Sequence, residues 1–139
     1  MAGKVSAKGA VIVLDDSGST GRTISSDVES YEIQYATDVI EVTGENEGSH
    51  NFIPGQKIIG VTLNLFWNAT ATTGAWTVVR GIIGSTTSVT LAITPESGGL
   101  TLSGEYMCDG VAITGSPATD IKLGAVHFSV MGSTAPAWA

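Results

Sequence analysis

Alternation of apolar and polar residues runs through most of this chain and predicts a fold built mainly of β-strands. The clearest case is residues 60–67, whose expected buried face consists of Val61, Leu63, Leu65 and Trp67. A period of two is typical of a strand in a sheet with one buried face. Similar patterns or β-branched runs predict strands at residues 9–14, 28–35, 38–43, 86–94, 100–108 and 121–131.

Residues 74–83 carry a different period. Apolar or long side chains recur there at three- and four-residue spacing, at Trp76, Val79, Arg80 and Ile83. This spacing predicts a short helix, which Thr72 or Thr73 could cap. Gly81 and the β-branched residues leave a strand as the alternative. Seven strands and one helix predict a single mainly β domain over residues 1–139, an antiparallel β-sandwich or barrel-like fold.

A long polar segment, residues 44–55, separates the predicted strands 38–43 and 60–67, and we expect Pro54-Gly55 to form a turn. A hairpin needs only two to five linking residues, so a loop of this length either has a role of its own or is disordered. We interpret it as a loop that reaches beyond its own domain.

Composition limits the possible partners. The net charge of −7 argues against a protein that grips nucleic acid, because that affinity comes mainly from basic groups. Only 14% of residues are charged while 42% are hydrophobic, which indicates apolar surface covered by other chains. Residues 27–47 hold seven acids and no Lys or Arg. Such a run predicts either a negative functional surface or a solvated sheet edge.

The sequence gives little indication of catalytic, metal-binding or phosphate-binding sites. The turn at residues 15–21 is rich in oxygen ligands, but it lacks the spacing of a calcium-binding EF-hand and is not a phosphate-binding loop. His50 and His127 stand in different settings and predict no shared metal, and Cys108 is expected to be a small core residue. No catalytic signature occurs in the sequence. We therefore expect a non-enzymatic protein without cofactor or metal.

The two ends of the chain are predicted to be arms, residues 1–8 and 134–139. The first is too poor in apolar residues to fold alone, and Trp138 is expected to dock on its own domain or on a neighbour. The sequence shows neither a signal peptide nor an apolar run of membrane-spanning length, which predicts a protein made or assembled in the cytoplasm, without membrane insertion.

The order of these features resembles the major tail tube proteins of long-tailed bacteriophages. The resemblance covers roughly residues 9–67 and rests on four short patterns: the Ile24-Ser-Ser step, Glu41-Val-Thr-Gly44, Ile53-Pro-Gly55 and Val61-Thr-Leu-Asn-Leu65. An appended C-terminal immunoglobulin-like domain, which some relatives carry, is not evident.

The resemblance implies a structural virion protein, located in the tail and assembled in the host bacterial cytoplasm. Such proteins form homo-oligomeric, six-membered rings whose sheets join into a continuous β-barrel. The rings stack into a tube that is measured by a tape-measure protein, contacts tail terminator and tip proteins, and conducts DNA without binding it specifically.

The same resemblance suggests roles for individual residues. Inter-ring contacts are implied for the loop residues Glu45, Asn46, Glu47, His50, Asn51 and Phe52, and subunit contacts for Lys4, Lys8 and Trp138 in the arms. Glu41 and Glu105 are interpreted as acids that face the lumen and repel phosphate.

Two other functions fit the sequence. The tube protein of type VI secretion systems is similar to tail tubes and would share every feature used above. A monomeric β-sandwich that binds carbohydrate would use Trp67 and Trp76 as stacking platforms, although Trp67 is expected on the apolar face of its strand.

Overall fold

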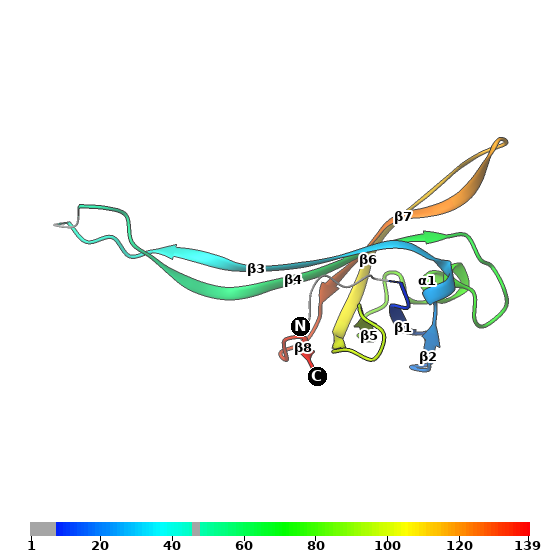
Figure 1. The fold of residues 1–139 in the computed structure, drawn as a ribbon, viewed down its shortest axis with the longest axis horizontal. Helices are drawn as coiled ribbons and strands as arrows, with labels where there is room; N and C mark the ends of the chain where they lie inside the picture. The colour runs from blue at the N-terminus through cyan, green and yellow to red at the C-terminus, as the bar shows by residue number, and fades with distance from the viewer. Residues whose placement is uncertain (1–7, 46–47) are drawn as a thin grey trace.

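The computed structural model describes residues 8–45 and 48–139 and consists mainly of antiparallel strands (Figure 1). The strands are β1 (Val11–Asp15), β2 (Gly21–Thr23), β3 (Val28–Glu41), β4 (Phe52–Phe66), β5 (Val89–Thr94), β6 (Leu102–Ser116), β7 (Thr119–Val130) and β8 (Ala137–Trp138). A 3₁₀ turn, η1 (Ser25–Asp27), precedes β3, and one α-helix, α1 (Ala75–Ile82), follows β4. The predicted mainly β fold with one short helix is confirmed.

The strands form one open sheet in the order β2-β1-β5-β6-β7-β4-β3, and β8 adds to β6. All of these pairings are antiparallel. The sheet does not close on itself in the single chain, so β3 is an edge strand that pairs only with β4 among the described residues. A sheet of this kind presents free backbone groups at its edges.

The core lies on one face of the sheet, where α1 covers it. Val61, Leu63 and Leu65 are almost fully buried, as the alternation predicts. Helix α1 contributes Ala75, Val78, Val79 and Ile82 to the same cluster. The helical interpretation of residues 74–83 is therefore confirmed, and its strand alternative is wrong.

The helix begins without the predicted threonine cap. Gly74 is the N-cap residue and makes no side-chain cap hydrogen bond. The carboxylate of Asp27 instead accepts a hydrogen bond from the Ala75 amide at 3.3 Å and from the Asn68 side chain at 3.0 Å. An acid from a distant turn thus occupies the positive end of the helix.

Two hairpins project from the body in different directions (Figure 1). The longer one consists of β3 and β4 and is paired from Val28 to Glu41. The other consists of β6 and β7, joined by Pro117 and Ala118. The sequence predicts neither at full length. Residues 28–35 and 38–41 belong to one strand, with Val42 and Thr43 beyond its end, and β6 continues eight residues beyond Cys108.

The predicted turn at Pro54-Gly55 is wrong, because both residues lie inside β4. The register advances two residues on β3, from Thr37 to Val39, while it advances three on β4, from Lys57 to Pro54. A β-bulge on β4 therefore absorbs one extra residue. The Thr37 hydroxyl donates to the Gly55 and Gln56 carbonyls at 3.3 and 3.4 Å, which ties the bulge to β3.

Candidate assembly interface

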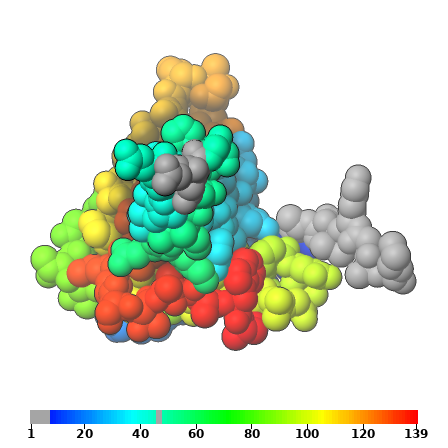
Figure 2. Space-filling model, turned by 90° about the vertical axis from the view of Figure 1, so that its left-hand side faces the viewer, coloured from blue at the N-terminus to red at the C-terminus, as the bar shows by residue number. Residues whose placement is uncertain are grey.

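The distal part of the β3–β4 hairpin, described at residues 35–45 and 48–58, projects from the body and is here called the arm (Figure 1). Figure 2 looks at its end, which lies in front of the body. Its exposed apolar side chains are Tyr35, Val39, Ile40, Val42, Phe52, Ile53 and Ile58, each between 45% and 65% exposed. An isolated two-stranded ribbon is marginally stable in water. The arm is thus a candidate for burial against another chain.

The end of the arm is held together by His50. Its Nδ1 lies 2.6 Å from Glu41 Oε1, and its ring stacks on Phe52 with centroids 6.4 Å apart. The Asn51 amide also donates to the Thr43 hydroxyl. Of the predicted loop residues, Phe52 opens β4, Glu45 is exposed, and Asn46 and Glu47 lie outside the described residues. Their assignment to inter-ring contacts stays a prediction.

The two acids predicted to face a lumen lie on opposite faces of the sheet. Glu41 is the last residue of β3, not a mid-strand residue, and it shares a face with Ile33 and Tyr35 because β3 alternates without interruption beyond Ser30. Ile33 packs against the core. Glu105 alternates with the buried Tyr106 and therefore lies on the face away from the core. The two acids cannot be treated as one patch.

The face away from the core is polar and carries a hydrogen-bonded cluster. Asp109 Oδ1 lies 2.7 Å from His127 Nδ1, and Ser129 donates to Asp109 Oδ2 at 2.7 Å. Burial raises the pKa of Asp109, but the bonds from Ser129 and His127 outweigh it and leave that pKa below its ordinary value. His127 is a strand residue with a hydrogen-bonded ring, as predicted.

Glu105 is part of the same polar face, nearer to β5. Its carboxylate accepts hydrogen bonds from the Ser88 hydroxyl at 2.9 Å and from the Thr90 hydroxyl. Glu32 on β3 is exposed and pairs in register with Thr62 of β4. Three acids, Glu32, Glu105 and Asp109, thus stand on a face to which the helix contributes nothing.

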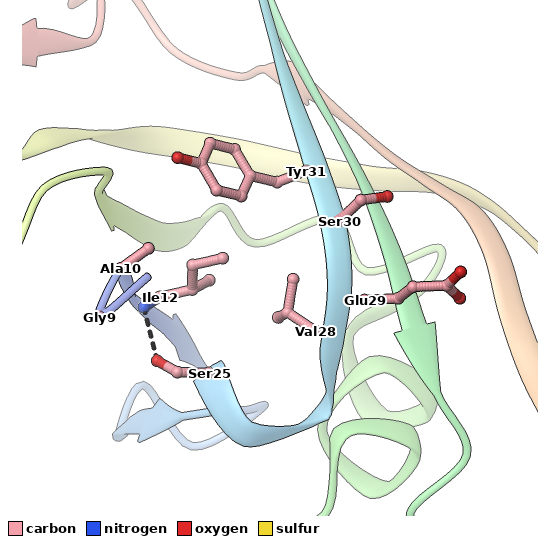
Figure 3. A pocket seen from close by; sticks show the side chains of 8 residues that line it. All are labelled: Gly9, Ala10, Ile12, Ser25, Val28, Glu29, Ser30 and Tyr31. Atoms are coloured by element: carbon pink, nitrogen blue, oxygen red, sulfur yellow. Dashed lines mark hydrogen bonds between the residues drawn. The ribbon is translucent and has the colours of Figure 1, made fainter. Parts of the chain in front are cut away.

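A groove of about 540 Å³ lies where the start of β3 approaches the residues that precede β1 (Figure 3). Ala10, Ile12, Val28 and Tyr31 supply its apolar lining. Ser25 at its lower rim accepts a hydrogen bond from the Ile12 amide at 2.8 Å. Glu29, also on the rim, forms an ion pair with Lys122 at 3.2 Å. Nothing in the sequence pattern signals this groove, because its walls come from separate segments.

Trp67 does not lie in the core, contrary to the alternation. Strand β4 ends at Phe66, and Trp67 is 37% exposed. Its ring stacks on Trp76 of α1, with centroids 5.2 Å apart. Each indole therefore covers a face of the other, which weakens their interpretation as free platforms for carbohydrate.

The two terminal segments, residues 1–8 and 134–139, are predicted to contact neighbouring subunits. Lys4 lies outside the described residues, and Lys8 is exposed. Trp138 belongs to β8 and pairs with Leu102 of β6, yet 42% of it remains exposed. It docks on its own sheet, and its contact with a neighbouring subunit stays a prediction.

The acidic turn between β1 and β2 has a structural explanation. Asp16 accepts hydrogen bonds from the amides of Thr20 and Gly18 and pairs with Arg22 at 2.9 Å. The Thr20 amide and the Arg22 side chain hold the pKa of Asp16 below its ordinary value. Residues 8–45 and 48–139 contain no group of three or more metal-binding side chains. Cys108 is buried, as predicted, and burial raises the pKa of its thiol.

No helix in the described part of the chain is long and apolar enough to cross a membrane. No protein-family model matches the chain, and no curated protein matches its sequence.

The fold is nevertheless similar to that of two solved structures. A chain from the virion of a native gene transfer agent particle superposes with a TM-score of 0.78 at 15% identity, over 98% of this chain and 99% of that one. A chain from the tail of an empty gene transfer agent particle, refined with C6 symmetry, gives 0.77 at 16% identity, over 96% and 99%. At such low identity the likeness establishes the fold. The chain therefore shares its fold with a chain of a gene transfer agent tail.

Proposed function

We propose that this chain is a structural virion protein that assembles as stacked rings into a phage-like tail tube. The proposal rests mainly on one observation: a four-stranded section of the sheet has a free edge on each side, and the two edge strands run in opposite directions. In the order β3-β4-β7-β6, the section begins with β3 and ends with the part of β6 that extends beyond β5. The fold likeness and the resemblance of the sequence to tail tube proteins support the same function.

Ring closure follows from the strand directions. Neighbouring strands in this section alternate in direction, so β6 runs opposite to β3. When the free edge of β6 at residues 109–116 lies beside β3 of the next copy at residues 32–38, their pairing is antiparallel and the sheet continues. This contact is heterologous, because it joins two different surfaces of the chain. Such contacts close into a ring when the rotation from one subunit to the next is a whole-number fraction of 360°. Six copies, as in the C6 tail, would contribute four strands each.

The lumen in this arrangement is lined by the polar face. The apolar core and α1 lie on the other face, so the sheet would present Glu32, Glu105 and Asp109 inward. Negative side chains repel phosphate and let DNA pass without being held. Glu41 is not assigned to the lumen. Contacts with a tape-measure protein and with terminator or tip proteins, and assembly in the host cytoplasm, follow from the same proposal.

Electron microscopy of the purified full chain, together with its mass in solution, tests the proposal. We expect rings or tubes with a central channel and a mass that is a multiple of the 14.2 kDa subunit, six-fold for single rings. A homogeneous 14.2 kDa monomer at all protein and salt concentrations would refute it and would favour a monomeric binding module.

A further inference from the structure

The groove beside the start of β3 has the form of a receptor for an extended strand. One wall is the edge of β3, which pairs with no other strand of the described chain on that side. The opposite wall is the main chain of Gly9 and Ala10, and Ile12, Val28 and Tyr31 form the apolar lining between them (Figure 3). A free strand edge with an adjacent apolar slot is the usual setting for the addition of a foreign strand.

The end of the arm offers a matching ligand. Val39 and Phe52 lie on one face of the ribbon and Ile40 and Ile53 on the other, and all four are about half exposed or more. An apolar ribbon in water gains free energy from burial on another surface. The tip is also extended in shape, as a strand-binding slot requires.

A chain cannot place its own arm in its own groove. Strand β3 runs without a break from Val28, in the groove, to Glu41, in the tip. At a rise of about 3.3 Å per residue, Val39 lies roughly 36 Å along β3 from Val28. The tip points away from the body that holds the groove (Figure 1). The occupant must come from a second copy.

Charge does not oppose this contact. Glu29 at the groove is already paired with Lys122. Glu41 in the tip is likewise paired with His50, so the two acids do not meet as bare charges. The contact therefore depends on apolar burial and strand pairing, and exposed ion pairs contribute little to it.

We propose that the tip of the arm, residues 39–42 and 52–53, docks in the Ala10–Tyr31 groove of a second copy in the adjacent ring. The inference rests on the proposed function, since it assigns the receptor for stacking between rings. Residues 32–38 of β3 remain available for the neighbour within the ring, because the groove uses only the first four residues of that strand and the tip begins at residue 39. The contact joins two different surfaces, so it propagates as a filament.

Disulfide cross-linking in assembled material tests this pairing. One chain carrying both Phe52→Cys and Ala10→Cys should yield a ladder of dimers, trimers and longer oligomers on oxidation, because a head-to-tail contact links every copy to the next. Each single variant should remain monomeric on a denaturing gel. Cys108 is buried and is left unchanged.

The matched control places the second cysteine elsewhere at an exposed site. Ala118 lies at the turn of the β6–β7 hairpin, and Phe52→Cys with Ala118→Cys should give no ladder. Tubes in the microscope without a ladder from the Phe52–Ala10 pair, or with an equal ladder from the control pair, would overturn the docking site while the proposed function stands. Absence of rings and tubes in the unmodified chain would refute both.

A blocking variant gives an independent measurement. Ala10→Trp should fill the groove, leave single rings in solution and reduce the tube fraction at least tenfold by sedimentation. Normal tubes from Ala10→Trp would contradict the proposal. Circular dichroism verifies that this variant is folded.

Discussion

Asp109 and His127 face each other across β6 and β7, with Oδ1 and Nδ1 2.7 Å apart. The pKa of Asp109 is lower in the folded chain than its ordinary value, so its stabilising effect is present above that value and is lost as pH falls through the folded pKa. We expect Asp109→Asn to cost about 1 kcal/mol at neutral pH, since the pair is partly exposed.

The pH profile distinguishes this effect from simple disruption. Between about pH 5 and pH 2, the unmodified chain should lose more unfolding free energy than Asp109→Asn, because only the former has a carboxylate to protonate. Urea unfolding at several pH values measures both curves. Parallel curves over that range would show that Asp109 contributes no acid-linked stability.

Tyr106 is fully buried, and its hydroxyl has no hydrogen-bond partner among the described residues. We expect Tyr106→Phe to stabilise the fold by about 1 kcal/mol, because it removes a buried polar group that lacks a partner. Burial raises the pKa of Tyr106 to about 12, so the unmodified chain should lose stability as pH rises from about 10 to about 12, and the variant should lose less. Tyr35→Phe, at an exposed site, is the control for stability at neutral pH and should leave it unchanged; Tyr35 is the lesser cause of the raised pKa of Tyr106, so this variant is not a control for the pH dependence.

Gly74 allows a close approach between the start of α1 and the preceding loop. A Cβ at this position would lie 2.4 Å from the Asn68 carbonyl oxygen and 2.7 Å from the Thr70 nitrogen. Both are backbone atoms that cannot rotate away, so Gly74→Ala should cost about 3 kcal/mol. Gly110→Ala would meet nothing within 4 Å and should change stability by less than about 0.5 kcal/mol. Thermal unfolding compares the two, and equal melting temperatures would contradict the packing argument.

The proposed lumen face can be tested by charge reversal in assembled tubes. Glu32→Lys and Glu105→Lys should increase the affinity of tubes for a short DNA roughly tenfold or more at low salt, with a steep loss as salt is added. Glu96→Lys makes the same charge change in the exposed turn between β5 and β6, outside the β3-β4-β7-β6 section, and is the control. Fluorescence anisotropy of labelled DNA measures the affinity. An equal increase in all three variants would argue against a lumen on the polar face.

The sequence predicts the part of the fold that the core determines. Val61, Leu63 and Leu65 alternate because one side of β4 is buried there, and the period of α1 is visible because one side of the helix packs on the sheet. Where apolar side chains occupy both faces of a ribbon, as at Val39 and Ile40, alternation disappears, and only the β-branched run at residues 38–43 indicates a strand.

Other differences arise from contacts between distant segments. Asp27 replaces a local helix cap, although 48 residues separate it from Ala75. The face of Glu41 depends on the full length of β3, which the sequence divides in two. The groove depends on how Ala10 and Tyr31 approach in space, which no local pattern encodes.

The bulge in β4 determines which β4 side chains share a face with which β3 side chains in the arm. Gly55 fits closely there, because a Cβ would lie 3.0 Å from that of Asp38 and would require Asp38 to shift. If β4 continued from the Thr37–Lys57 pair without the bulge, Ile53 instead of Phe52 would lie opposite Glu41, so the one extra residue places Phe52 on the same side as Glu41. One extra residue in β4 thus determines which side chains of the arm lie on the face that contacts another surface.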